Sequence, residues 1–149
     1  MSNTNQSTYT PSTSPSPNIR ATLAWVDAYN ELDVNKLSAL VDESLQFEVL
    51  PKSLGRPISN KEEYLTNFEK HIIPLFKRFH ASSEGESVLG SVYKNEYVIF
   101  LHFVPPKEGG DGLPKISVVK EFTDSHTTLE FIKEEQARAA ANAKKTVSD

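Results

Sequence analysis

Two carboxylates stand at the end of one β-rich segment, where a side chain can act as a base. Residues 115–125 read KISVVKEFTDS, with Glu121 and Asp124 just ahead of a predicted helix start. A carboxylate in an apolar pocket has its charged form disfavoured, which raises its pKa toward the range useful for general base catalysis. Glu121 and Asp124 are therefore candidate catalytic residues.

Strand geometry separates the two carboxylates. Alternate side chains of an unbroken strand point to opposite faces, which places Glu121 with Val119 and Asp124 with Phe122. The pattern thus supports a lone base rather than a pair of carboxylates acting together. In the alternative interpretation Asp124 caps the following helix, and Glu121 is solvated or ion-paired with a neighbouring strand.

A histidine and several aromatic residues are further candidates. His102 interrupts a strand predicted over 97–104, and it could be an acid or base in a pocket, or a buried core or dimer-interface histidine. Trp25, Tyr29 and Tyr64 lie on predicted helices, and their polar tips could bind a ligand oxygen or stabilise an enolate. Aromatic residues at helical spacing also form ordinary core. Phe100, two residues before His102, is a candidate substrate contact.

Composition excludes several function classes. The 149 residues contain no cysteine and four scattered histidines, so we expect no metal site. The sequence has no glycine-rich phosphate loop, so we also expect no cofactor. The net charge of −4 gives no case for nucleic acid or an anionic membrane, and no apolar run approaches a span of about 20 residues. The first residues lack the basic and apolar regions of a secretory signal, so we expect a cytoplasmic protein.

The order of elements predicts one α+β domain. We expect a disordered Ser/Thr/Pro-rich tail over 1–18, the domain over 19–143 and a second disordered tail over 144–149. Helices are predicted at 19–32, from Asp33 or Asn35, from a capping box at 59–62 through Phe79 with a kink or break at Pro74, and from Ser125 or Thr127. The predicted strands are 45–49, 97–104 and 116–122, and Val88, Leu89 and Val92 could form one more short strand. Helices segregated from an antiparallel sheet make an α+β fold.

An ordered set of segments resembles one known family. The segments are AWVDAY at 24–29, LGRP at 54–57, NKEEY at 60–64, IPLF at 73–76, NEYVIF at 95–100 and the strand at 115–125. Together they resemble the SnoaL-like branch of the NTF2-like superfamily, in particular its fungal members, over 19–135. The resemblance implies a cone in which N-terminal helices wrap a curved antiparallel sheet around one apolar pocket. A C-terminal helix and dimerisation through the sheet are also implied.

The resemblance implies two kinds of function. The first is cofactor-free isomerisation, cyclisation or dehydration of a polyketide- or terpenoid-like small molecule, with Asp124 or Glu121 as base and His102 or a tyrosine as proton donor. The second is a non-catalytic, dimeric ligand-binding or interaction module. Between the third helix and Gly90 the sequence leaves room for about one strand less than the family pattern. This predicts a cone open on one side, or a shortened and degenerate variant.

Overall fold

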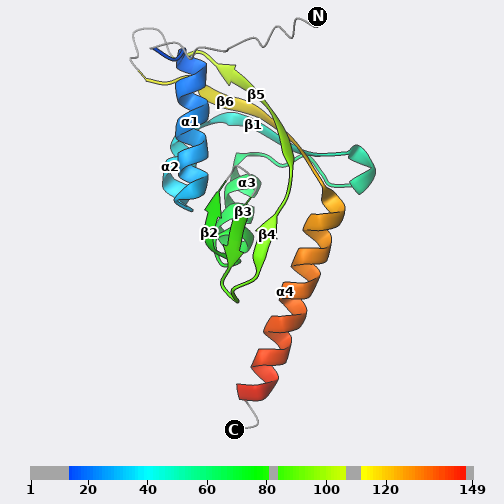
Figure 1. Cartoon of the computed structure of the whole chain (residues 1–149). Coiled ribbons are helices and arrows are strands. Elements are labelled where there is room, and N and C mark those ends of the chain that lie inside the picture. Colours follow the sequence, from blue (N-terminus) through cyan, green and yellow to red (C-terminus); the bar gives the residue numbers. More distant parts are fainter. Residues whose placement is uncertain (1–13, 81–83, 107–111, 147–149) are drawn as a thin grey trace, which may run out of the picture.

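Four α-helices and six strands make up the fold in the computed structural model, which describes residues 14–80, 84–106 and 112–146 (Figure 1). The helices are α1 (Pro17–Asn30), α2 (Val34–Leu40), α3 (Lys61–Asn67) and α4 (Ser125–Thr146). The strands are β1 (Val41–Leu50), β2 (Phe76–His80), β3 (Glu84–Ser87), β4 (Val92–Lys94), β5 (Tyr97–Val104) and β6 (Lys115–Thr123). A short 3-10 turn at Lys52–Leu54 and a π-helical turn at Phe68–Ile72 complete the elements.

The strands form two sheets of three strands each. One sheet has the order β1-β6-β5, and it arches over α3 and the second sheet, β2-β3-β4 (Figure 1). Strand β6 pairs antiparallel with β5 but parallel with β1, so the expectation of a wholly antiparallel sheet is wrong for this pair. In the described residues no strand pair joins the two sheets. The result is the expected α+β cone, with its sheet unclosed.

Strands β2, β3 and β4 were not predicted where they lie: β2 falls in the predicted helix, and Val88 and Leu89, expected in a short strand with Val92, lie in the turn between β3 and β4. We predicted helix through Phe79, but the helical segment ends at a turn around Pro74, and Phe76–His80 pairs with β3. The register of this pair shifts between Phe76 and Arg78, so Phe76 and Phe79, three positions apart, both face inward. This bulge reproduces the spacing of a helix. Two strands, β2 and β3, therefore precede Gly90, and the sheet is unclosed, as the prediction of a cone open on one side requires.

Strand β5 is an edge strand, not a covered central one. Its partner β6 lies at the centre of the sheet, and only one face of β5 turns toward the helices. On the other face Val98 and Phe100 are about half exposed, as is Phe122 of β6. The continuous apolar sequence of β5 thus reflects one face toward the interior and one apolar face toward the outside.

Helix starts follow local hydrogen-bonding chemistry. The Ser16 side chain accepts from the Ile19 amide at 3.3 Å, so α1 begins at Pro17, just before the predicted domain start at 19. The capping box of α3 consists of Asn60 and Glu63, one residue later than predicted. Asp124 accepts from the amides of His126 and Thr127 and so caps α4, which continues to Thr146, past the predicted end at 143. Most of the predicted N-terminal tail lies outside the described residues.

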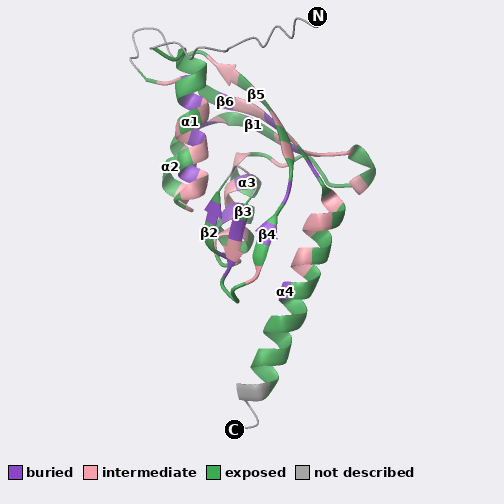
Figure 2. Cartoon of the chain, in the orientation of Figure 1, coloured by how far each residue is buried: buried purple, intermediate pink, exposed green. Residues whose placement is uncertain are grey.

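The core lies between the N-terminal helices and the concave face of the β1-β6-β5 sheet (Figure 2). Trp25, Leu37 and Phe68 from helical segments pack there against Ile116 and Val119 of β6. A smaller cluster of Phe76, Phe79 and Tyr93 joins the second sheet to α4. Among the described residues, no helix is long and apolar enough to cross a membrane.

Candidate active site

A cavity of about 910 Å³ opens beneath the arched sheet. Its wall comes from α1, α3, the π-helical turn, both sheets and α4 as far as Ala139, and most of the lining side chains are apolar or aromatic. The volume lies within the range of small-molecule sites, which extends to about 1,000 Å³. The cone therefore holds one pocket large enough for a polycyclic ligand.

Glu121 is the carboxylate that the sheet presents to this cavity. Its register partners on the neighbouring strands are Val49 of β1 and Ile99 of β5, and both also line the cavity. Apolar side chains thus flank the carboxylate on both neighbouring strands. Burial raises the pKa of Glu121 to about 7. The side chain can therefore exchange a proton near neutral pH.

Three side chains of the helices form a hydrogen-bonded group beside Glu121. The indole N–H of Trp25 donates to the Tyr64 hydroxyl at 3.2 Å, and the hydroxyls of Tyr64 and Tyr29 are 2.8 Å apart. Burial raises the pKa of both phenols, and the charge of Glu121 raises them further. Tyr29 and Tyr64 therefore stay protonated and serve as hydrogen-bond donors, not as bases.

A second group of hydroxyls lies where β4, β5 and α4 meet. The hydroxyls of Tyr93 and Tyr97 are 2.7 Å apart, and the Asn95 amide donates to the Tyr93 hydroxyl at 2.8 Å and to the Thr128 hydroxyl at 2.8 Å. Burial, the Tyr93 hydroxyl and the charge of Glu121 all raise the pKa of Tyr97. Because the Tyr29, Tyr64 and Tyr97 phenols all sense the Glu121 charge, phenol groups lie near this carboxylate from two sides.

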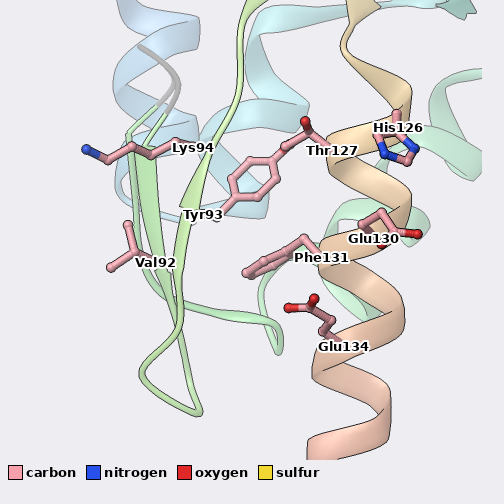
Figure 3. Close-up of a pocket in the computed structure, with 8 residues that line it drawn as sticks. All are labelled: Val92, Tyr93, Lys94, His126, Thr127, Glu130, Phe131 and Glu134. Atoms are coloured by element: carbon pink, nitrogen blue, oxygen red, sulfur yellow. The ribbon is translucent and has the colours of Figure 1, made fainter.

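The wall between β4 and α4 is thin. Phe131 of α4 contacts Tyr93 of β4, with ring centroids 4.8 Å apart, and Thr127 and Glu134 flank Phe131 on the same helix (Figure 3). Tyr93 and Phe131 line the main cavity on one side and a shallower hollow of about 450 Å³ on the other. The pair therefore separates the cavity from the outer surface.

The predicted site residues divide into two groups. Glu121, Trp25, Tyr29 and Tyr64 line the cavity, as the hypothesis of a pocket requires. Asp124, His102 and Phe100 are exposed and do not line it. Asp124 caps α4, and its bonds to Thr127 and His126 lower its pKa. His102 and Phe100 lie on the outer face of β5, because alternation along that strand turns Ile99 and Leu101 inward instead.

Sequence reasoning missed other residues that line the cavity. Tyr97 shares the inward face of β5 with Ile99, and strand alternation could have identified it. His71 lies on the π-helical turn, which no sequence pattern indicated. Glu135 of α4 is only 4% exposed, whereas the apolar stripe of Leu129, Ile132 and Ala139 or Ala140, which the helical spacing predicts to be buried, is not: Leu129 and both alanines are exposed. The sequence signal that could have identified Glu135 is a charged residue at an apolar helical spacing.

The site contains little that would hold a metal. Among the described residues, no three His, Cys, Asp or Glu side chains come together as a metal-ion site requires. The polar groups at the cavity include the carboxylate of Glu121, whose pKa is raised, and several neutral phenols. This combination suits proton transfer.

Comparison with known proteins identifies the architecture. No family model and no curated protein sequence matches the chain. Among solved structures, BvnE pinacolase from Penicillium brevicompactum superposes with a TM-score of 0.68 at 20% identity, over 83% of this chain and 96% of that one. PrhC from Penicillium brasilianum gives 0.65 at 17% identity, over 84% and 91%. A putative dehydratase of the NTF2-like family from Streptomyces avermitilis gives 0.52 at 15%, over 71% and 92%.

The chain has an NTF2-like fold. The shared fold extends over almost the whole of BvnE pinacolase. The resemblance seen in the sequence is confirmed for the fold. At these identities the likeness extends no further.

Proposed function

We propose that this NTF2-like protein is a cofactor-free enzyme that moves a proton next to a carbonyl group of an apolar small molecule. The observation that carries the proposal is the position of Glu121 between Val49 and Ile99, which raises its pKa to about 7. A carboxylate with such a pKa is a stronger base than an ordinary one and is still about half ionised at neutral pH. It is the proton acceptor in this mechanism.

The phenols provide the second half of the chemistry. Glu121 removes the proton from the carbon next to the ketone, and the electron pair of that C–H bond moves to the carbonyl oxygen, giving an enolate. An O–H of Tyr64 or Tyr29 donates a hydrogen bond to that developing oxyanion. The protonated Glu121 then returns its proton to the γ-carbon, which isomerises the double bond. With a β-hydroxy ketone it protonates the departing hydroxyl instead, which dehydrates the molecule.

Cavity size and structural likeness indicate the class of substrate. A largely apolar space of about 910 Å³ suits a polycyclic or long-chain ketone of polyketide or terpenoid type. Two similar structures bear the names pinacolase and putative dehydratase, and both names describe rearrangement or elimination on small organic molecules. These names support the reaction class proposed here.

A direct test uses a cyclic β,γ-unsaturated ketone, because its isomerisation to the conjugated enone is visible by ultraviolet absorption. Glu121→Gln removes the base with little change of shape, and we expect the rate to fall by about 10² to 10⁴. Asp124→Asn is the matched control, since asparagine also caps helices and Asp124 is outside the cavity. Unchanged turnover in Glu121→Gln would remove the mechanism.

The exposed face of the β1-β6-β5 sheet favours a homodimer. This face carries three half-exposed apolar side chains, Val98 and Phe100 on the edge strand β5 and Phe122 on β6. We propose that the same face of a second copy covers them, because a two-fold interface pairs identical patches. Tight ligand binding by this dimer, with no turnover of any ketone, would favour the second candidate function, a non-catalytic ligand-binding module.

A further inference from the structure

The opening of the cavity carries hydrogen-bond donors and no carboxylate among the residues that the structure describes. A side chain that lines the cavity and is also exposed lies at its opening. The polar side chains of this kind are Arg56, Asn67, His71 and Gln136, and the other exposed lining residues are apolar. The two carboxylates of the lining, Glu121 and Glu135, are more buried. The opening is therefore suited to a group that accepts hydrogen bonds.

Arg56 is the permanently charged residue of this opening. Its guanidinium forms no ion pair and no hydrogen bond with any described residue, whereas Arg78 pairs with Glu86 and Arg138 donates to Ser91. A guanidinium stays charged at every physiological pH and presents its N–H donors in a planar fork. The donors of Arg56 are thus available to a molecule in the cavity.

The backbone that carries Arg56 is held on both sides. Before it, the turn at 51–55 closes with two backbone hydrogen bonds of 3.0 Å, and Gly55 ends that turn in the left-handed region with φ 64°. After it, the amide and carbonyl of Ser59 bond to those of Phe47 in β1 at 2.9 Å. Because this loop is already fixed, a ligand that binds Arg56 needs to order only the side chain.

Arg56 and the proposed base lie at separate places on the wall. A guanidinium in contact with Glu121 would lower the pKa of that carboxyl group. Burial is instead the cause of the raised pKa of Glu121, with no contribution from Arg56. Both residues nevertheless line the same cavity. A molecule that reaches both therefore has a reacting group inside and a second polar group at the opening.

We propose that Arg56 binds a carboxylate of the substrate at the opening of the cavity, while the ketone lies beside Glu121. This inference rests on the proposed function and names its substrate class, an apolar ketone that carries one carboxylate. The two oxygens of a carboxylate match the guanidinium fork, and its single charge balances one arginine. A phosphate ester carries up to about two negative charges at neutral pH, and so it fits this opening less well.

Two probes that differ in one group test the proposal. Both are the same bicyclic β,γ-unsaturated ketone, and the ring farthest from the carbonyl carries a free carboxylate in one and its methyl ester in the other. Binding is followed by quenching of Trp25, the single tryptophan of the chain, which lines the cavity. We expect the wild-type protein to bind the acid about 5- to 20-fold more tightly than the ester. This is less than a buried charged hydrogen bond gives, because the opening is exposed to solvent.

Arg56→Gln should abolish this preference and leave the affinity for the ester within about twofold. Arg56→Lys should keep part of it, because lysine retains the charge but loses the fork. Arg20→Gln is the matched control, since Arg20 is exposed on α1, does not line the cavity and loses the same charge. The control should bind both probes as the wild-type protein does. An equal loss for acid and ester in Arg56→Gln, or no preference in the wild-type protein, would overturn the proposal.

A third probe tests the kind of anion. It carries a phosphate ester in place of the carboxylate, and we expect it to bind no more tightly than the acid. Tighter binding of the phosphate that depends on Arg56 would show that the assignment to a carboxylate is wrong.

Turnover of the same probes separates this inference from the proposed reaction. If the preference for the acid depends on Arg56 but neither probe is isomerised, the site for the carboxylate stands and the reaction is wrong. If acid and ester are isomerised with equal KM and kcat, the reaction stands and the role of Arg56 is wrong. If both proposals hold, Arg56→Gln should raise KM for the acid and leave its kcat nearly unchanged, because Arg56 does not touch the reacting atoms.

Discussion

The indole N–H of Trp25 donates its hydrogen bond to the hydroxyl oxygen of Tyr64, at 3.2 Å. Tyr29 reaches the same oxygen at 2.8 Å, and either phenol could be the donor in that contact. The three side chains hold three hydrogens but use only two of them among themselves. One phenolic O–H is left over, and Tyr64 and Tyr29 both line the cavity. The arrangement therefore offers one hydrogen-bond donor to a bound molecule.

Removal of that donor should slow the reaction more than it weakens binding. We expect Tyr64→Phe to lower kcat by about 10² to 10³, because the lost hydrogen bond is strongest to the oxyanion of the transition state. Trp25→Phe should have a smaller effect, since Trp25 acts only by orienting the Tyr64 hydroxyl. Steady-state kinetics on the β,γ-unsaturated ketone measures both. An increase in KM with unchanged kcat in Tyr64→Phe would contradict this role.

The pKa of Glu121 determines how the rate should vary with pH. The base must be ionised, so kcat/KM should rise with pH and level off above about pH 7. An exposed glutamate with an ordinary pKa would give a nearly constant kcat/KM between pH 5 and pH 9. A pH profile from 5 to 9 on wild-type protein distinguishes them. A curve that is level between pH 5 and pH 9 would exclude Glu121 as the titrating base.

The same pKa also predicts a stability effect. The folded state holds the Glu121 proton more tightly than the unfolded chain, whose carboxyl has a pKa of 4.5, so ionisation costs folding free energy as pH rises from 4.5 to about 7. Glu121→Gln should therefore stabilise the protein at pH 8 by about 1 to 3 kcal/mol, and by much less at pH 4.5. Urea unfolding at both pH values measures this. The exposed Glu130→Gln serves as control and should show no such difference.

Asp124 should affect stability and not catalysis. Its carboxylate accepts from two amides at the start of α4 and from the Thr127 hydroxyl. Loss of such a cap in Asp124→Ala should lower the free energy of unfolding by about 1 kcal/mol, whereas Asp124→Asn should keep most of it. Thermal unfolding and turnover are measured together on both variants. A large loss of kcat in the stable Asp124→Asn would return this residue to the catalytic candidates.

The exposed sheet face gives a prediction about assembly. If two copies pair through it, Phe100→Ser should shift the protein toward a monomer by removing an apolar side chain from the centre of the patch. Light scattering after size-exclusion chromatography reads the mass directly. Ile58→Ser is a matched control, because Ile58 is equally exposed but lies outside this sheet. A wild-type monomer at high protein concentration would contradict the dimer.

Sequence patterns identified Glu121 as a candidate base but did not reveal its surroundings. Alternation along one strand is a local property, so the opposite orientation of Glu121 and Asp124 could be read from the sequence. The flanks of Glu121 depend on pairing with strands far away in the chain, and the parallel β1–β6 pair leaves no mark in either strand. Alternation could also have shown that Phe100 and His102 share a face, but not that this face is the outer one.

The spacing of apolar residues predicted the wrong secondary structure where a β-bulge changed the alternation of side chains along a strand. Phe76 and Phe79 are three positions apart, which is typical of a helix, yet both face inward from β2 because the strand takes an extra residue between them. A second register shift in the β5–β6 pair likewise turns both Ile116 and Val119 inward. Bulges follow from tertiary curvature of the sheet and are not visible in a pattern of apolar residues.

The parallel pairing of β1 with β6 bears on how the molecule is made. Val49 and Glu121 are register partners although they are roughly seventy positions apart, and β6 is the central strand of its sheet. Contacts over such long sequence separations form slowly, because a large loop must close before they are gained. A chain emerging from the ribosome therefore holds β1 without its partner until residues 115–123 have been synthesised. The strand that carries Glu121 is the same one that completes the sheet, so the fold and the proposed base should come into place in one late step.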